Sequence, residues 1–128
     1  MCRMLASADV TAFGALRRPI RWAVAMLVEV VYFDGCPGHE RVLPLVRRLA
    51  ARAGAEVVLR RVETPEDADA ERFLGSPTVR VDGVDVEPGA AEREDFGLKC
   101  RIYQAPDGLS GVPAERWLHE ALAWRPRR

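Results

Sequence analysis

Two hydrophobic patterns follow one another in the first half of the chain. Residues 27–33 form an apolar run rich in β-branched and aromatic side chains, which is typical of a buried strand. From Val42 to Ala53 the apolar residues recur at helical spacing and stop at Gly54, so this segment is predicted to be an amphipathic helix. A second apolar run at residues 56–62 predicts another strand.

The next elements are indicated by local signals for a helix start and a turn. Thr64 can accept a hydrogen bond as a helix cap, and Pro65 suits the first helical position, so we expect a short helix that continues to about Leu74. Further on, Asp82-Gly83 lies between two valine-containing segments. This dipeptide favours a two-residue turn, which predicts an antiparallel hairpin.

The last quarter of the chain completes the predicted order. Residues 98–103 alternate as a strand would, which places Cys100 on the same face as Leu98 and Ile102. Pro113 opens a final helix with an apolar stripe. The elements therefore follow the order βαβαββα, with an insertion before the last helix, and predict an α/β domain.

The domain is expected to cover residues 26–124. Residues 1–25 show little periodicity, so we interpret them as a loose tail or as an over-extended gene product, with Met26 as a natural start and no role for Cys2. Arginines followed by an apolar run imitate a secretory signal here, but Glu29 interrupts the run, which is shorter than the roughly 20 residues that span a bilayer. We expect a cytoplasmic chain without a membrane partner.

Composition and charge exclude several kinds of function. The 128 residues carry 19 basic and 19 acidic side chains, so the formal net charge is zero and nucleic acid is a poor partner. Three cysteines are too few for a disulfide-stapled secreted miniprotein. The sequence offers no acidic pair, phosphate-binding loop or Ser-His-Asp set, and we expect no cofactor. The oligomeric state stays open.

Cys36 is the main candidate for chemistry. It lies in Cys36-Pro37-Gly38-His39, between the first predicted strand and the first predicted helix. The free N–H groups and the positive dipole end of a helix start favour an anion, and the thiolate is the nucleophilic form of cysteine. The alternative is that Cys36 is a small buried apolar side chain.

Two further residues could act with Cys36. His39 is three positions along the same helix start, where it could be a charge partner or a proton relay for the thiolate, or a solvent-facing histidine without a task. The insertion that carries Cys100 begins near Cys36 if the predicted hairpin returns the chain to that end of the sheet. Cys100 could then resolve a disulfide formed by Cys36. Alternatively, Cys100 belongs to the core.

The chain resembles the thioredoxin-like superfamily at three places. Cys36-Pro37-Gly38-His39 lies where that family carries Cys-x-x-Cys, Pro44 lies eight residues after Cys36 where thioredoxins often have a proline, and Ser76-Pro77-Thr78 looks like the cis-proline turn. The resemblance covers most of residues 26–124. It implies a three-layer sandwich and a redox-active cysteine.

The resemblance also implies a substrate-binding site, and the chain departs from the family at one position of the cysteine motif. A cis Pro77 would face Cys36, and Pro37, Ser76, Pro77 and Thr78 would contact substrate. The segments Phe-Asp-Gly-Cys-Pro and Gly-Ser-Pro-Thr-Val-Arg-Val-Asp-Gly are most similar to small actinobacterial thioredoxin-like proteins, whose relatives are sometimes labelled alkylmercury lyases. Here, however, a histidine replaces the second cysteine of the motif, so a resolving thiol must come from elsewhere.

Three functions follow as hypotheses. The first is a thiol-disulfide oxidoreductase-like protein in which Cys36 attacks a small-thiol or protein disulfide and Cys100, or a small thiol, resolves the product. The second is a protein that binds Zn, Cu or Hg, or handles organomercurials, through Cys36, His39 and Cys100. The third is a thioredoxin-fold module without catalysis.

Overall fold

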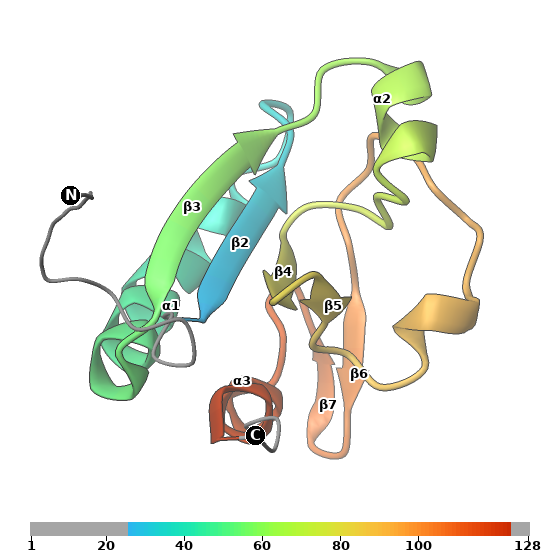
Figure 1. The fold of residues 1–128 in the computed structure, drawn as a ribbon. Coiled ribbons are helices and arrows are strands. Elements are labelled where there is room, and N and C mark those ends of the chain that lie inside the picture. Colours follow the sequence, from blue (N-terminus) through green and yellow to red (C-terminus); the bar gives the residue numbers. More distant parts are fainter. Residues whose placement is uncertain (1–25, 124–128) are drawn as a thin grey trace, which may run out of the picture.

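The computed structural model describes residues 26–123, which form a mixed sheet with helices and a separate hairpin (Figure 1). The expectations for residues 1–25, Cys2 included, lie outside the described residues. In chain order the elements are β2 (Leu27–Tyr32), α1 (Gly38–Ala53), β3 (Glu56–Arg61), α2 (Pro65–Ala70), β4 (Thr78–Val81), β5 (Val84–Asp85), the 3₁₀ turn η3 (Ala90–Glu92), β6 (Tyr103–Ala105), β7 (Gly108–Ser110) and α3 (Glu115–Ala123).

The main sheet has four strands in the order β3-β2-β4-β5. β2 pairs in parallel with β3 and antiparallel with β4, so α1 crosses over between the two parallel strands. β4 and β5 form the predicted hairpin, and the turn residues Asp82 and Gly83 have φ angles of 51° and 85°, as a type I′ turn requires. The α/β class and the predicted order of the main elements are confirmed.

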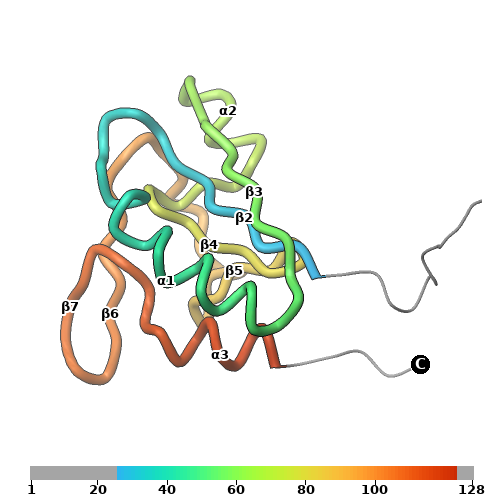
Figure 2. Tube along the Cα trace, turned by 90° about the vertical axis from the view of Figure 1, so that its left-hand side faces the viewer, coloured from blue at the N-terminus to red at the C-terminus, as the bar shows by residue number. Residues whose placement is uncertain are grey.

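One face of the sheet carries most of the apolar core. α1 and α3 contact each other and lie on the same side of the sheet, whereas α2 lies apart from them (Figures 1 and 2). Trp117 and Leu118 of α3 are buried against Val28 and Val30 of β2 and against the apolar stripe of α1. The apolar stripe of α3 therefore completes the core between α1 and the sheet.

The opposite face is covered in a different way. A smaller apolar cluster of Val31, Val62, Ala68 and Phe73 packs beneath α2 at one end of β2. Along the rest of this face, the Glu29 carboxylate accepts a hydrogen bond from Arg60 at 2.7 Å. The short α2 ends at Ala70 rather than near Leu74, so its capped first turn was predicted correctly but its length was not.

The strand predicted over residues 98–103 is wrong in extent and in facing. Only Cys100 forms an isolated β-bridge, and the regular strand β6 begins at Tyr103 and pairs with β7. The facing is reversed as well, because Arg101 and Tyr103 are buried, whereas Cys100 is exposed and Ile102 is 59% exposed. Carboxylates that hold the Arg101 guanidinium inside the protein account for the reversal.

The helices of the described part of the chain are too short or too polar to cross a membrane.

Candidate functional site

Cys36 lies in the connection between β2 and α1. α1 begins at Gly38 after Pro37, which makes no capping hydrogen bond with its side chain, so the first N–H groups of this 16-residue helix have no side-chain acceptor there. Cys36 is only 6% exposed, and its thiol donates a hydrogen bond to the Ser76 carbonyl with 3.6 Å between Sγ and O. The sulfur therefore faces the turn that precedes β4.

That turn has the predicted conformation. The Ser76–Pro77 peptide bond is cis, which confirms the prediction for Pro77. Gly38 allows Pro77 to approach the start of α1, because a Cβ at position 38 would lie 2.9 Å from Pro77 Cδ and 3.7 Å from Cys36 Sγ. Any other residue in place of Gly38 would push the turn away from the thiol.

Cys100 reaches the same turn from the other side. Its segment pairs with Ser76: the Ser76 amide donates to the Lys99 carbonyl at 2.8 Å, and the Arg101 amide donates to the Ser76 carbonyl at 2.9 Å. The pKa of Cys100 is raised above its ordinary value, chiefly by a hydrogen bond with the Cys36 thiol, then by desolvation and by the charge of Cys36. The Cys36 thiol and the Cys100 segment therefore meet at Ser76, and the alternative that Cys100 belongs to the core is wrong because Cys100 is exposed.

His39 contacts the backbone of Cys36. Its Nδ1 lies 3.3 Å from the Cys36 carbonyl, and its half-buried ring stacks on Tyr32 with 4.1 Å between the ring centroids. Because a carbonyl oxygen only accepts hydrogen bonds, this contact requires that Nδ1 carries a proton. His39 therefore has two partners within the protein, and its action on the Cys36 thiol stays a prediction.

A metal-binding set was one of the hypotheses for these residues. Within residues 26–123, no group of three or more His, Cys, Asp or Glu side chains has an arrangement that could hold a metal ion. Cys36, His39 and Cys100 do not form such a group.

The four residues expected to contact substrate differ in exposure. Pro37 is exposed beside Cys36, whereas Ser76, Pro77 and Thr78 are buried. The Thr78 hydroxyl donates to the Gly75 carbonyl at 2.7 Å and accepts from Arg101 at 2.9 Å, so it holds the turn together. Ser76 Oγ is buried and has no hydrogen-bond partner among the described residues.

Sequence reasoning missed Arg101 and its partners. The guanidinium is buried and forms ion pairs with Asp85 at 2.8 Å and Glu87 at 2.7 Å. Burial alone would lower the pKa of Arg101, but the Tyr103 hydroxyl and the two carboxylates outweigh it and raise that pKa above its ordinary value. The available signal was the alternation of Asp85 and Glu87 in one segment with Arg101 and Tyr103 in another, which matches two facing extended chains.

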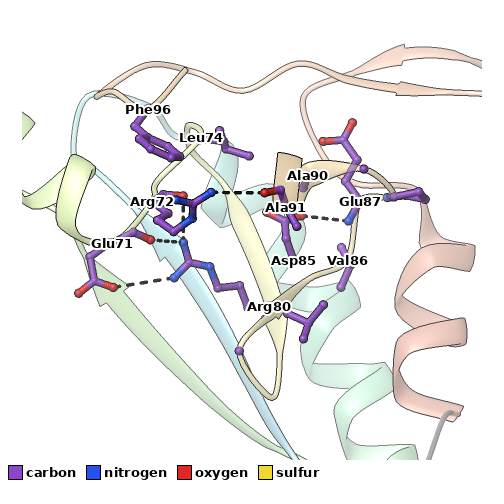
Figure 3. A pocket seen from close by; sticks show the side chains of 14 residues that line it. Glu71, Arg72, Leu74, Arg80, Asp85, Val86, Glu87, Ala90, Ala91 and Phe96 are labelled. Atoms are coloured by element: carbon purple, nitrogen blue, oxygen red, sulfur yellow. Dashed lines mark hydrogen bonds and ion pairs between the residues drawn. The ribbon is translucent and has the colours of Figure 1, made fainter. Parts of the chain in front are cut away.

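The same two carboxylates line a cavity of about 480 Å³ (Figure 3). Asp85 and Glu87 line it together with Arg72 and Phe96, and the Arg72 guanidinium lies 4.9 Å from the Phe96 ring centroid. Neither cysteine lines this cavity, so the paired thiols form a separate site.

Comparisons with known proteins do not assign the chain to a family. No protein-family model matches it, and no curated protein matches it either. Function is therefore inferred from the two cysteines and the turn between them.

Proposed function

We propose that this protein is a thiol-disulfide redox protein in which Cys36 is the nucleophile and Cys100 is the resolving thiol. The observation that carries the proposal is that both cysteine segments meet at Ser76: the Cys36 thiol donates to the Ser76 carbonyl at 3.6 Å, and Cys100 forms a β-bridge with Ser76. Both cysteines are free, as they would be in the reduced form of a Cys36–Cys100 disulfide.

The reaction has two exchange steps. In the first step, the Cys36 thiolate attacks a disulfide R–S–S–R, forming the Cys36–S–S–R bond and releasing one R–S⁻, which takes up a proton. In the second step, Cys100 loses its proton and attacks Cys36 Sγ, forming the Cys36–Cys100 bond and releasing the second R–S⁻. The protein is oxidised by two electrons, and the substrate disulfide is reduced to two thiols.

The order of attack follows from the surroundings of the two sulfurs. Cys36 lies just before α1, whose first N–H groups have no side-chain acceptor at Pro37, and helix starts of this kind favour an anion. The pKa of Cys100 is raised by Cys36, so less of it is thiolate at neutral pH and it is the poorer first nucleophile. Once Cys36 is bound in a mixed disulfide its charge is gone, and Cys100 then becomes easier to deprotonate.

We also propose that the chain belongs to the thioredoxin-like superfamily. Support comes from the order of the main elements, from the cysteine between β2 and α1, and from the cis proline packed against the start of that helix. The chain departs from that family in its second thiol, because Cys100 comes from a segment after the main sheet and not from the helix. His39 takes the position of the usual second cysteine and binds the Cys36 carbonyl instead.

A trapping experiment with glutathione disulfide tests the order of steps. The Cys100→Ser variant should accumulate a mixed disulfide with glutathione on Cys36, because the resolving thiol is missing. The parent chain should release the glutathione and form the Cys36–Cys100 disulfide, as identified by peptide mass spectrometry. The matched Cys36→Ser variant should carry glutathione only on Cys100 of this pair and cannot form the Cys36–Cys100 disulfide. Equal labelling of Cys36 and Cys100 by glutathione in the parent chain would contradict the proposed order.

A further inference from the structure

The segment that carries Cys100 has little regular structure of its own. It lies between η3 and β6, and its β-pairing is the isolated bridge from Cys100 to Ser76. Cys100 itself is exposed, so burial of its side chain does not fix its place. Some other contact has to hold its thiol beside Cys36.

The neighbouring residue, Arg101, provides that contact. Its side chain is 1% exposed, and its guanidinium donates two hydrogen bonds to the Asp85 carboxylate, at 2.8 and 3.1 Å, and one to Glu87 at 2.7 Å. A guanidinium held by two carboxylates has a fixed direction, because its planar donors match their oxygens. The Cys100 segment is thereby tied to β5 and to the residues that follow it.

Arg101 is also tied to the turn beside Cys36. It donates to the Thr78 hydroxyl at 2.9 Å, and that hydroxyl in turn donates to the Gly75 carbonyl. The guanidinium lies 4.4 Å from the Tyr103 ring centroid, and the Tyr103 hydroxyl donates to the Pro77 carbonyl. Both the turn and the Cys100 segment are therefore oriented by the same cation.

We propose that Arg101 is the positioning residue that holds the Cys100 thiol at the distance from Cys36 that the second exchange step needs. This inference rests on the proposed function, because the position of Cys100 matters only if the second exchange step takes place. The position itself is a property of the reduced protein and can be measured separately. Arg101 acts through the peptide bond it shares with Cys100 and through its own amide, which donates to the Ser76 carbonyl. Asp85 and Glu87, which line the cavity in Figure 3, are its fixed anchors.

The variants separate positioning from stability. Arg101→Met removes the ion pairs but leaves two carboxylates without their cation, which destabilises the fold. The triple variant Arg101→Met/Asp85→Asn/Glu87→Gln removes those charges as well and should recover much of the lost stability. Arg93→Met is the matched control, because Arg93 also pairs with Glu87, at 3.4 Å, but is far more exposed than Arg101.

Proximity is measured in the full chain with Cys2→Ser as background. Dibromobimane becomes fluorescent when it bridges two neighbouring thiols, so it reports the distance between Cys36 and Cys100 in the reduced protein. The parent and Arg93→Met should cross-link alike. Arg101→Met and the triple variant should cross-link at least about tenfold more slowly, since small displacements of reacting groups cost rate steeply. Arg101→Lys, which keeps the charge, should restore part of the rate.

A triple variant that melts like the parent and also cross-links like the parent would overturn the inference, whatever Arg101→Met does. The same samples are then equilibrated with glutathione buffers to follow disulfide formation. If the parent cross-links but forms no Cys36–Cys100 disulfide, the redox function fails, while the role of Arg101 in holding the two thiols together is still decided by the cross-linking rates.

Discussion

Cys36 and Cys100 differ in surroundings although both segments contact Ser76. Cys36 is nearly buried between β2 and α1, and Cys100 is exposed. The position of Cys36 between a strand and a helix could be predicted from the sequence, because the apolar run of β2 and the helical spacing of α1 lie on either side of it. The buried role of Arg101 could not be predicted in the same way, because a charged residue is expected outside and the carboxylates that hold it come from another segment.

At this scale the first prediction concerns the proton on Cys100. Cys36 raises the pKa of Cys100 through a hydrogen bond and through charge, so Cys36→Ala should lower the pKa of Cys100 toward its ordinary value. A larger fraction of Cys100 is then thiolate at any given pH below that pKa, and its alkylation becomes faster. Iodoacetamide rates measured from pH 6 to 10, with each thiol quantified by peptide mass spectrometry, give both pKa values. An unchanged or higher pKa of Cys100 in Cys36→Ala would mean that the two thiols do not interact.

Among the elements, those with strong local signals were predicted well. α1 ends at Gly54 and the β4–β5 hairpin turns at Asp82-Gly83, because helical periodicity and turn chemistry act within a few residues. The segment 98–103 was predicted wrongly because its facing is decided by Asp85 and Glu87, which no local pattern reveals. The β6–β7 hairpin was missed for a different reason, because its local turn signal, Pro106-Asp107-Gly108, was not used.

The second prediction at this scale tests the role of α3. Leu118 is fully buried between α3, α1 and the sheet, so Leu118→Ala should lower the free energy of unfolding by about 2–5 kcal/mol. Leu109→Ala is the matched control, because Leu109 in β7 is 71% exposed and its loss should change stability by about 0.5 kcal/mol or less. Urea denaturation followed by circular dichroism measures both. Similar losses for the two variants would show that α3 does not complete the core.

For the whole molecule, the site is assembled from three segments that are distant in the sequence. The start of α1 brings Cys36, the turn before β4 brings Ser76 and Pro77, and the segment before β6 brings Cys100. The α/β sheet could be predicted from the sequence, and it explains why the first two segments meet. The third segment meets them at Ser76, whose amide donates to the Lys99 carbonyl and whose carbonyl accepts from the Arg101 amide. No local pattern in the sequence reveals that pairing.

The most direct test of the account is a redox titration of the full chain in glutathione buffers. Samples are quenched with an alkylating reagent at each ratio of reduced to oxidised glutathione, and the state of each cysteine is read by peptide mass spectrometry. We expect one reversible two-electron transition in which Cys36 and Cys100 lose their free thiols together and become joined in one disulfide. Free thiols at both positions under oxidising conditions, or glutathione bound to each cysteine independently, would contradict it.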